Sequence, residues 1–120
     1  MAMKIIFLDI ETVPTDLSLQ ENGLLEPQIQ LNETELIKKF SLSAATAKIL
    51  CLCYAIEPST DTEVQVLQGE ETEIIKGFWK LAVECNLFVG HNILDFDLRF
   101  IYQRSIIHRI KPSRDLPFAR

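Results

Sequence analysis

The stretch KIIFLDIETVP, residues 4–14, is an apolar segment that runs into two acids. Its Ile and Phe side chains are typical of a buried β-strand, and we predict a strand over residues 4–10. Side chains two positions apart on a strand point to the same face, so Asp9 and Glu11 are expected to be neighbours, roughly 7 Å apart. A divalent cation such as Mg²⁺ or Mn²⁺ would relieve their mutual repulsion. The alternative is that the strand ends at Ile10 and both acids face solvent.

The size and composition of the chain fit one soluble domain. It has 120 residues, of which 48% are hydrophobic and 24% charged, and this length leaves room for one sizeable core but not for a second domain. The longest apolar runs are too short for a membrane span, and no charged segment precedes a signal-like stretch. We therefore expect a cytoplasmic protein.

The three cysteines, Cys51, Cys53 and Cys85, lie in apolar stretches without Cys-x-x-Cys spacing. In a reducing compartment such cysteines behave as small hydrophobic side chains. We predict that all three are buried, and a metal or disulfide role is disfavoured.

The net charge of −5 is unevenly distributed along the chain. Residues 98–120 hold six of the twelve basic residues and one of the seventeen acidic ones. A basic stripe of this kind can follow the phosphates of a nucleic acid. The alternative is a solvated helix face followed by an exposed tail.

The periodicity of the remaining chain predicts the element order β, β, β, α, β, α. Residues 13–33 show no sustained periodicity and are expected to form a long excursion. The expected elements that follow are a short helix over 33–40, a hairpin of strands over 48–56 and 62–68, a helix over 70–85, a strand over 87–90 and a helix over 96–108.

A second group of acids follows the predicted 87–90 strand, in the stretch GHNILDFD. Asp95 and Asp97 stand where the last helix is expected to begin, and one of them is expected to cap it. Acids at the carboxyl ends of buried strands tend to meet at one edge of a sheet, where ligand sites of α/β proteins form. We therefore expect this group to converge with Asp9 and Glu11.

The two stretches together resemble a known family. FLDIET, residues 7–12, followed about eighty residues later by GHNILDFD, residues 90–97, is similar to the first two motifs of the DEDD (DnaQ-like) 3′-to-5′ exonucleases. The Asn-x-x-x-Phe-Asp form of the second motif resembles that of the proofreading exonuclease domain of family B DNA polymerases, and of free-standing bacterial proteins related to it. The resemblance implies a ribonuclease H-like α/β fold, with a mixed sheet of three antiparallel strands and one parallel strand flanked by helices.

The resemblance also implies a catalytic metal site. Asp9, Glu11 and Asp97 would be the catalytic carboxylates that bind two divalent cations, Mg²⁺ or Mn²⁺, with Asp9 bridging both. The implied reaction is hydrolysis of phosphodiester bonds at the 3′ end of single-stranded nucleic acid, with release of nucleoside 5′-monophosphates. DNA is the expected substrate, although the sequence does not distinguish it from RNA.

Three further residues are assigned to the nucleic acid by the same resemblance. Thr12 would lie near the 3′-terminal nucleotide and Asn92 near the scissile phosphate or its neighbour. Phe96 belongs to the same motif, where it would chiefly pack the helix onto the sheet. Asp95 has no role in the family pattern and is left as a candidate cap.

One motif of the family is missing from the chain. The third motif, Tyr-x-x-x-Asp or His-x-x-x-x-Asp, carries the fourth carboxylate and the general base, but no Tyr or His here is followed by Asp at that spacing. We interpret residues 1–120 as a single incomplete exonuclease domain, with motif I at 9–12 and motif II at 92–97, cut before the last strand and helix. Such a chain is expected to turn over weakly or not at all, and to expose apolar surface that a dimer would cover.

Three other functions stay open. A ribonuclease H-like endonuclease would share the fold and the acidic metal site, but the paired motifs favour an exonuclease. A phosphatase of the haloacid dehalogenase type would carry Asp-x-Asp, so Glu11 disfavours it. A catalytically inactive nucleic-acid-binding module is compatible with the missing third motif.

Overall fold

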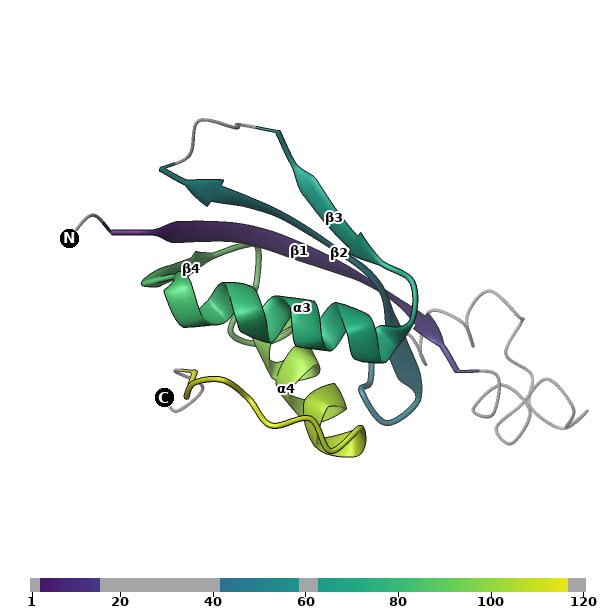
Figure 1. The fold of residues 1–120 in the computed structure, drawn as a ribbon. Coiled ribbons are helices and arrows are strands. Elements are labelled where there is room, and N and C mark those ends of the chain that lie inside the picture. The colour runs from purple at the N-terminus through teal and green to yellow at the C-terminus, as the bar shows by residue number, and fades with distance from the viewer. Residues whose placement is uncertain (1–2, 16–41, 59–62, 117–120) are drawn as a thin grey trace, which may run out of the picture.

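The computed structural model describes residues 3–15, 42–58 and 63–116. Within these ranges the elements form a sheet with helices on one side of it (Figure 1). In chain order they are β1 (Ile5–Pro14), β2 (Ala47–Glu57), β3 (Gln65–Gln68), α3 (Glu71–Glu84), β4 (Leu87–Val89) and α4 (Asp97–Ile107). The predicted order β, β, β, α, β, α is confirmed, while the helix expected over 33–40 lies outside the described residues.

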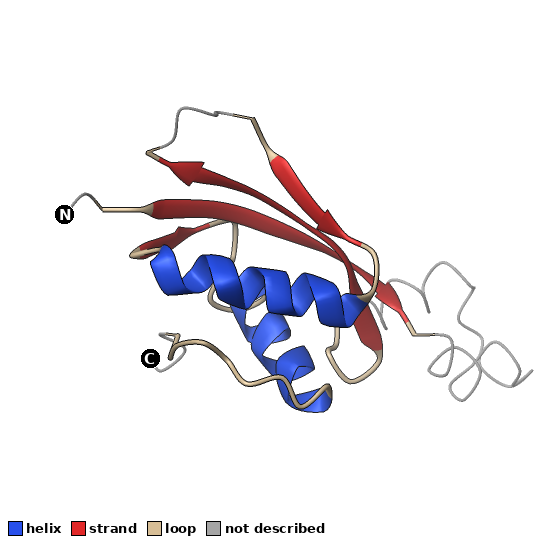
Figure 2. Ribbon diagram, viewed as in Figure 1, coloured by secondary structure: helices blue, strands red, loops and turns tan. Residues whose placement is uncertain are grey.

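The four strands form one mixed sheet in the order β3-β2-β1-β4 (Figure 2). β2 is antiparallel to both of its neighbours, β1 and β3, whereas β4 is parallel to β1. Three antiparallel strands joined to one parallel strand and flanked by helices constitute the α/β arrangement that the sequence predicted. The structure is consistent with a ribonuclease H-like fold.

β1 is longer than predicted. The expectation that it ends at Ile10 is wrong, because the pairing with β2 continues to Pro14, opposite Ala47. A proline is tolerated at a strand end, where its missing N–H removes no essential ladder bond. Glu11 lies opposite Cys51 but Thr12 lies opposite Ile49, so Leu50 is an extra residue in β2 and forms a bulge.

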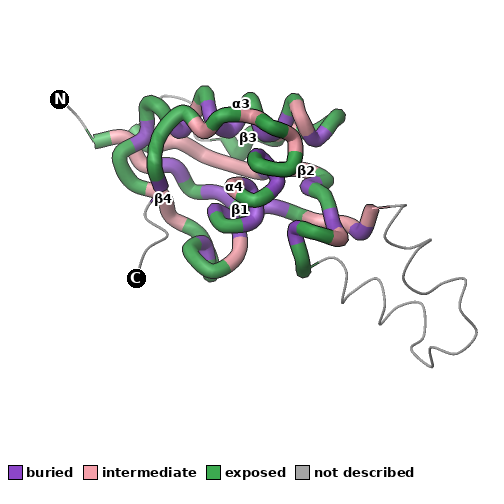
Figure 3. Tube along the Cα trace, turned by 90° about the horizontal axis from the view of Figure 1, so that it is seen from below, coloured by how far each residue is buried: buried purple, intermediate pink, exposed green. Residues whose placement is uncertain are grey.

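The core lies between the sheet and the two helices. Alternate residues of β1, Ile6, Leu8 and Ile10, are buried on the face that the helices cover. α3 buries the predicted stripe, including Ile74 and Phe78, and Figure 3 shows buried and exposed positions alternating along it. Burying such a side chain fully contributes roughly 2 kcal/mol, so this stripe fixes α3 against the sheet.

The opposite face of the sheet carries no described helix (Figure 1). Residues between the buried positions of β1, namely Phe7, Asp9 and Glu11, point to this face and are exposed. Val66 of β3 lies opposite Cys53 and is 49% exposed. We call this surface the open face.

The cysteines divide between the two faces. Cys85, after α3, is buried as predicted, but Cys51 and Cys53 are only half-buried. They are the cross-strand partners of Glu11 and Asp9, so they belong to the open face and the prediction of burial is wrong for them. The sequence missed this because β2 is apolar on both faces, which hides the alternation. No helix within the described ranges is long and apolar enough to cross a membrane.

Candidate metal and nucleic-acid site

The two sequence motifs meet at one edge of β1. β4 pairs with β1 only from Ile5 to Phe7, so the next residues of β1 face the turn that joins β4 to α4. Gly90 begins this turn, and a Cβ atom there would lie 2.7 Å from the carbonyl oxygen of Leu8. Only glycine allows the turn to pass this close to β1. Asn92 has a φ of 54°, a left-handed conformation that asparagine adopts more readily than most residues.

Asp97 is held against β1 by a backbone hydrogen bond. Its Oδ2 atom accepts a bond of 3.0 Å from the N–H of Ile10, and the residue is only 3% exposed. Asp97 is the first residue of α4, so the helix start positions its carboxylate on the strand. Because Ile10 lies between Asp9 and Glu11, the contact brings the second motif to the first, as predicted.

The pKa of Asp97 reflects its burial and the charges around it. Burial raises the pKa of Asp97 to about 6, from a usual 3.8. The N–H of Ile10 lowers this pKa, the carboxylate of Asp9 raises it, and His91 lowers it. The Asp97 carboxylate therefore lies in a low-dielectric position next to another negative charge, which is the environment that a cation stabilises.

Asp9 and Glu11 are both exposed on the open face, as the strand alternation predicted. In the described part of the chain, no three His, Cys, Asp or Glu side chains are arranged to hold a metal ion. Mg²⁺ is commonly bound by one or two carboxylates, with water and substrate phosphates as the remaining ligands. The adjacent carboxylates of Asp9 and Asp97 suit that chemistry, and Glu11 lies two residues along the same strand.

The residues assigned to the nucleic acid surround this edge without forming one cluster. Asn92 is exposed on the turn and Thr12 is half-buried beyond the bulge of β2. Phe96 packs against the core, with its ring 5.4 Å from that of Phe100, so its predicted packing role is confirmed. The N-cap position of α4 is occupied by Phe96, so the prediction that Asp95 or Asp97 caps the helix is wrong.

His91 is a residue whose influence the sequence did not reveal. It is exposed on the turn and its charge lowers the pKa of Asp97. Its place directly before Asn92 in GHNILDFD was the available signal, but a histidine in a turn has no distinctive spacing. Only the fold shows that this turn packs on β1.

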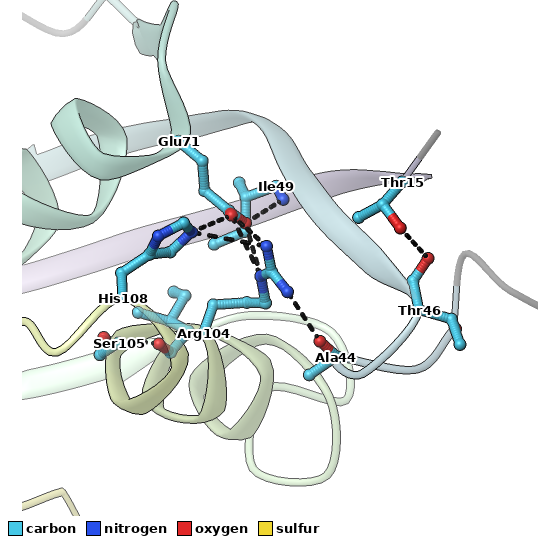
Figure 4. Close-up of polar contacts among 9 residues, drawn as sticks. Thr15, Ala44, Thr46, Ile49, Glu71, Arg104, Ser105 and His108 are labelled. Atoms are coloured by element: carbon cyan, nitrogen blue, oxygen red, sulfur yellow. Dashed lines mark hydrogen bonds and ion pairs between the residues drawn. The ribbon is translucent and has the colours of Figure 1, made fainter. Parts of the chain in front are cut away.

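A buried polar network joins α3, α4 and the start of β2 (Figure 4). The Glu71 carboxylate accepts hydrogen bonds from Arg104 Nε at 3.0 and 3.1 Å, and from the Ile49 N–H at 2.6 Å. His108 Nε2 lies 2.6 Å from Glu71 Oε1, and Arg104 Nη1 donates to the Ala44 carbonyl at 3.0 Å. Burial would raise the pKa of Glu71, but the bonds to it outweigh burial and hold the pKa below its usual value. The network fixes α3 and α4 to the start of β2.

This network changes the interpretation of the basic segment. Arg104 is buried in an ion pair, and Arg114 donates to the carbonyl oxygens of Ala82 and Cys85 near the end of α3. The Arg104 guanidinium is therefore not presented to solvent as part of a continuous stripe. The exposed basic residues of the described 98–116 segment are Arg99, Arg109, Lys111 and Arg114.

Comparison with known proteins supports the fold alone. No protein-family model and no curated protein matches the chain. Among solved structures, the chain is similar to the family B DNA polymerase from the hyperthermophilic archaeon Pyrobaculum calidifontis, with a TM-score of 0.57 and 18% sequence identity. The similarity covers 92% of this chain but 12% of the polymerase chain. The chain therefore shares the fold of a small region of that enzyme.

Proposed function

We propose that this domain is a metal-dependent 3′-to-5′ exonuclease of the DEDD type, acting in the cytoplasm on the 3′ end of single-stranded DNA. The observation that carries the proposal is the hydrogen bond from the Ile10 N–H to Asp97, which joins the two motifs at one edge of the sheet. The bond satisfies the Ile10 N–H, which lies beyond the end of the β4 pairing, and it also brings the two acidic stretches together. A cation shared between them would relieve their mutual repulsion.

The three carboxylates would contribute to metal binding in different ways. Asp97 is fixed by Ile10 and buried, whereas Asp9 and Glu11 are exposed and can adjust to a ligand. Two Mg²⁺ or Mn²⁺ ions bound here would activate a water molecule and stabilise the leaving 3′ oxygen. The protein's own contribution is to position these charges and to hold the 3′ end of the DNA.

The contacts to the nucleic acid follow from the turn and from β1. Asn92 is exposed on the turn that leads to α4 and would offer an amide to a backbone phosphate, while Thr12 would offer a hydroxyl near the terminal nucleotide. Such contacts do not depend on which base is present, so they suit an enzyme that recognises the 3′ end of a strand and not its sequence. The similarity of fold to a DNA polymerase favours DNA over RNA as the substrate.

The 120 residues alone are proposed to be a weak catalyst. They contain no Tyr-x-x-x-Asp or His-x-x-x-x-Asp motif, which in the resembled family carries the fourth carboxylate and the general base. Exposed apolar residues of the open face, such as Phe7 and Val66, are proposed to be covered by a second copy of the chain.

A nucleic-acid-binding module without catalysis is the second candidate, and the same missing motif favours it. This module would bind single-stranded 3′ ends through Asn92 and Thr12 but would release no nucleotide. The two candidates differ only in turnover, so one assay separates them.

The test incubates the chain with Mn²⁺ and a single-stranded DNA carrying a 5′ label. An exonuclease yields a ladder that shortens from the 3′ end, and Asp9→Ala and Asp97→Ala abolish it. The exposed Asp115→Asn variant is the matched control and leaves the ladder unchanged. Binding without shortening favours the second candidate, whereas internal cuts or activity indifferent to Asp9 would contradict the exonuclease.

A further inference from the structure

The bulge in β2 turns two consecutive residues away from the core, beside Glu11. Ile49 and Leu52 are both buried, and in a regular strand only one residue would separate two positions on the same face. Here two residues, Leu50 and Cys51, stand between them. In a bulge two residues of one strand oppose one residue of its partner, so both lie opposite Glu11. The bulge therefore presents Leu50, which is 51% exposed, to solvent beside a proposed metal ligand.

Lys48 projects from β2 on the same side of the sheet. It lies directly opposite Val13, and Val13 shares a face with Glu11 because the two are two residues apart on β1. Lys48 is exposed, and it makes no ion pair with any residue in the described ranges. It is the only lysine or arginine in the four strands that the structure describes. These strands therefore contribute a single positive charge to the open face, and it lies two positions along the sheet from Glu11.

We propose that Lys48 and Leu50 bind the single-stranded nucleic acid, with the Lys48 ammonium on a backbone phosphate and the Leu50 side chain against the adjoining sugar and base. This inference rests on the proposed function, because it assigns two further contacts to the substrate of the same site. The pair of Val13 and Lys48 lies roughly 7 Å along the sheet from Glu11. One nucleotide of an extended single strand spans a similar distance. A strand whose scissile phosphate lies at the carboxylates can therefore place the neighbouring phosphate at Lys48.

The two side chains match the two kinds of surface that a nucleotide presents. A phosphate binds lysine as a compact positive charge, while the sugar and the face of the base are surfaces against which an apolar side chain packs. β3 pairs with β2 only from Cys51 onwards, so no described strand flanks Leu50 or Lys48 on that side. The carboxylates of the site would repel a phosphate, and a positive charge beside them reduces that repulsion. Charge and position therefore favour a nucleic-acid strand as the occupant.

The test measures binding of labelled single-stranded DNA by fluorescence anisotropy, without divalent ions, over a range of NaCl concentrations. On a plot of the logarithm of the association constant against the logarithm of the salt concentration, each phosphate neutralised on a single strand contributes about 0.7 to the slope. Lys48→Ala should therefore weaken binding and lower the slope by about 0.7, and Lys48→Arg should retain the wild-type slope. Leu50→Ala should weaken binding about threefold to tenfold without changing the slope, because it removes apolar contact and no charge.

Two exposed residues of α3, on the helix-covered side of the sheet, provide matched controls. Lys76→Ala removes a positive charge and Val83→Ala an apolar side chain, and both variants should bind DNA as wild type does. Because the assay needs no turnover, these effects in a chain that cuts no DNA still support the two contacts. A wild-type slope in Lys48→Ala, or no DNA binding by wild type at low salt, would overturn the proposal even if a nuclease ladder is observed. Weaker self-association of Leu50→Ala with unchanged DNA binding would also overturn it, and would assign this surface to a second copy of the chain.

Discussion

The backbone N–H of Ile10 donates a hydrogen bond of 3.0 Å to Oδ2 of Asp97, a residue 87 positions later in the chain. This bond joins the strand that carries the first motif to the helix that carries the second. It also places a carboxylate in a buried position beside Asp9, and burial is the main reason that the pKa of Asp97 rises to about 6. The residue proposed to bind metal is therefore also one whose charge affects the stability of the fold.

The first prediction concerns the effect of the Asp97 charge on the free energy of unfolding. Because folding raises this pKa from 3.8 to about 6, the protonated form is favoured in the folded state. The stability that the protonated Asp97 carboxyl contributes to the fold is fully present below pH 3.8 and is lost as the pH rises through 6. Asp97→Asn keeps an acceptor for Ile10 without the charge, so it should raise the free energy of unfolding at pH 8 by about 3 kcal/mol.

Urea denaturation of wild type and variant from pH 4 to pH 8, without metal, measures this difference. The gain should shrink towards zero at pH 4, and Asp115→Asn, at an exposed position, should show no such pH dependence. A gain that is the same at both pH values would show that the Asp97 charge is not its source.

The second prediction concerns the buried ion pair. Glu71→Gln leaves the Arg104 guanidinium buried without its counter-charge, and should lower the free energy of unfolding by about 3 kcal/mol or more. The combined Glu71→Leu and Arg104→Met variant should recover much of this loss, because neither charge is then left unpaired. The surface pair of Lys4 and Glu84 is the control, and Lys4→Ala should cost less than about 1 kcal/mol.

The same pair predicts how the fold responds to acid. The pKa of Glu71 is lowered on folding, so its contribution is present above its usual 4.5 and is lost as the pH falls through the folded value. Wild type should therefore lose more stability than the Leu and Met double variant between pH 5 and pH 2, as measured by thermal unfolding. Equal losses in the two proteins would contradict this role for Glu71.

The third prediction tests the close approach at Gly90. A methyl group there meets the Leu8 carbonyl oxygen, a backbone atom that cannot rotate away, so Gly90→Ala should destabilise the fold by about 1–3 kcal/mol. Gly77→Ala is the matched control. Gly77 lies within helix α3, and a Cβ atom there meets only the flexible side chain of Leu67 on β3. Gly77→Ala should be neutral or stabilising, because alanine favours a helix by about 1 kcal/mol over glycine. Chemical denaturation of both variants decides the point.

The fourth prediction separates two roles of Asn92. Its φ of 54° suits glycine, so Asn92→Gly should keep the turn, whereas Asn92→Leu should cost about 1–2 kcal/mol in strain. If the amide also contacts the nucleic acid, Asn92→Gly should weaken binding of a single-stranded 3′ end at unchanged stability. Fluorescence anisotropy with labelled DNA measures this, and wild-type affinity in Asn92→Gly would remove Asn92 from the interface.

The sequence predicted the element order well because its signals are local. The apolar run in residues 4–10 and the helical stripe of Ile74 and Phe78 depend on near neighbours, and both predicted elements were confirmed. The meeting of the two motifs was also predictable, since strand ends of this kind converge on one edge. The continuation of β1 to Pro14 was not, because it depends on pairing with β2.

Features that depend on residues far apart in the sequence were not predicted. Arg104 was interpreted as part of a basic stripe, but Glu71, 33 positions away, buries it in an ion pair. Cys51 and Cys53 were expected in the core, but only the register with β1 shows which face they occupy. Long-range pairing decided both outcomes.

The most direct test of the central claim is Mn²⁺ binding at pH 8, read from the loss of the free-ion signal in electron paramagnetic resonance. We predict that wild type binds Mn²⁺ and that Asp9→Asn and Asp97→Asn each weaken binding by at least about tenfold. Asp115→Asn should bind as wild type does. Unchanged Mn²⁺ binding by Asp97→Asn would contradict a metal site shared between the two motifs.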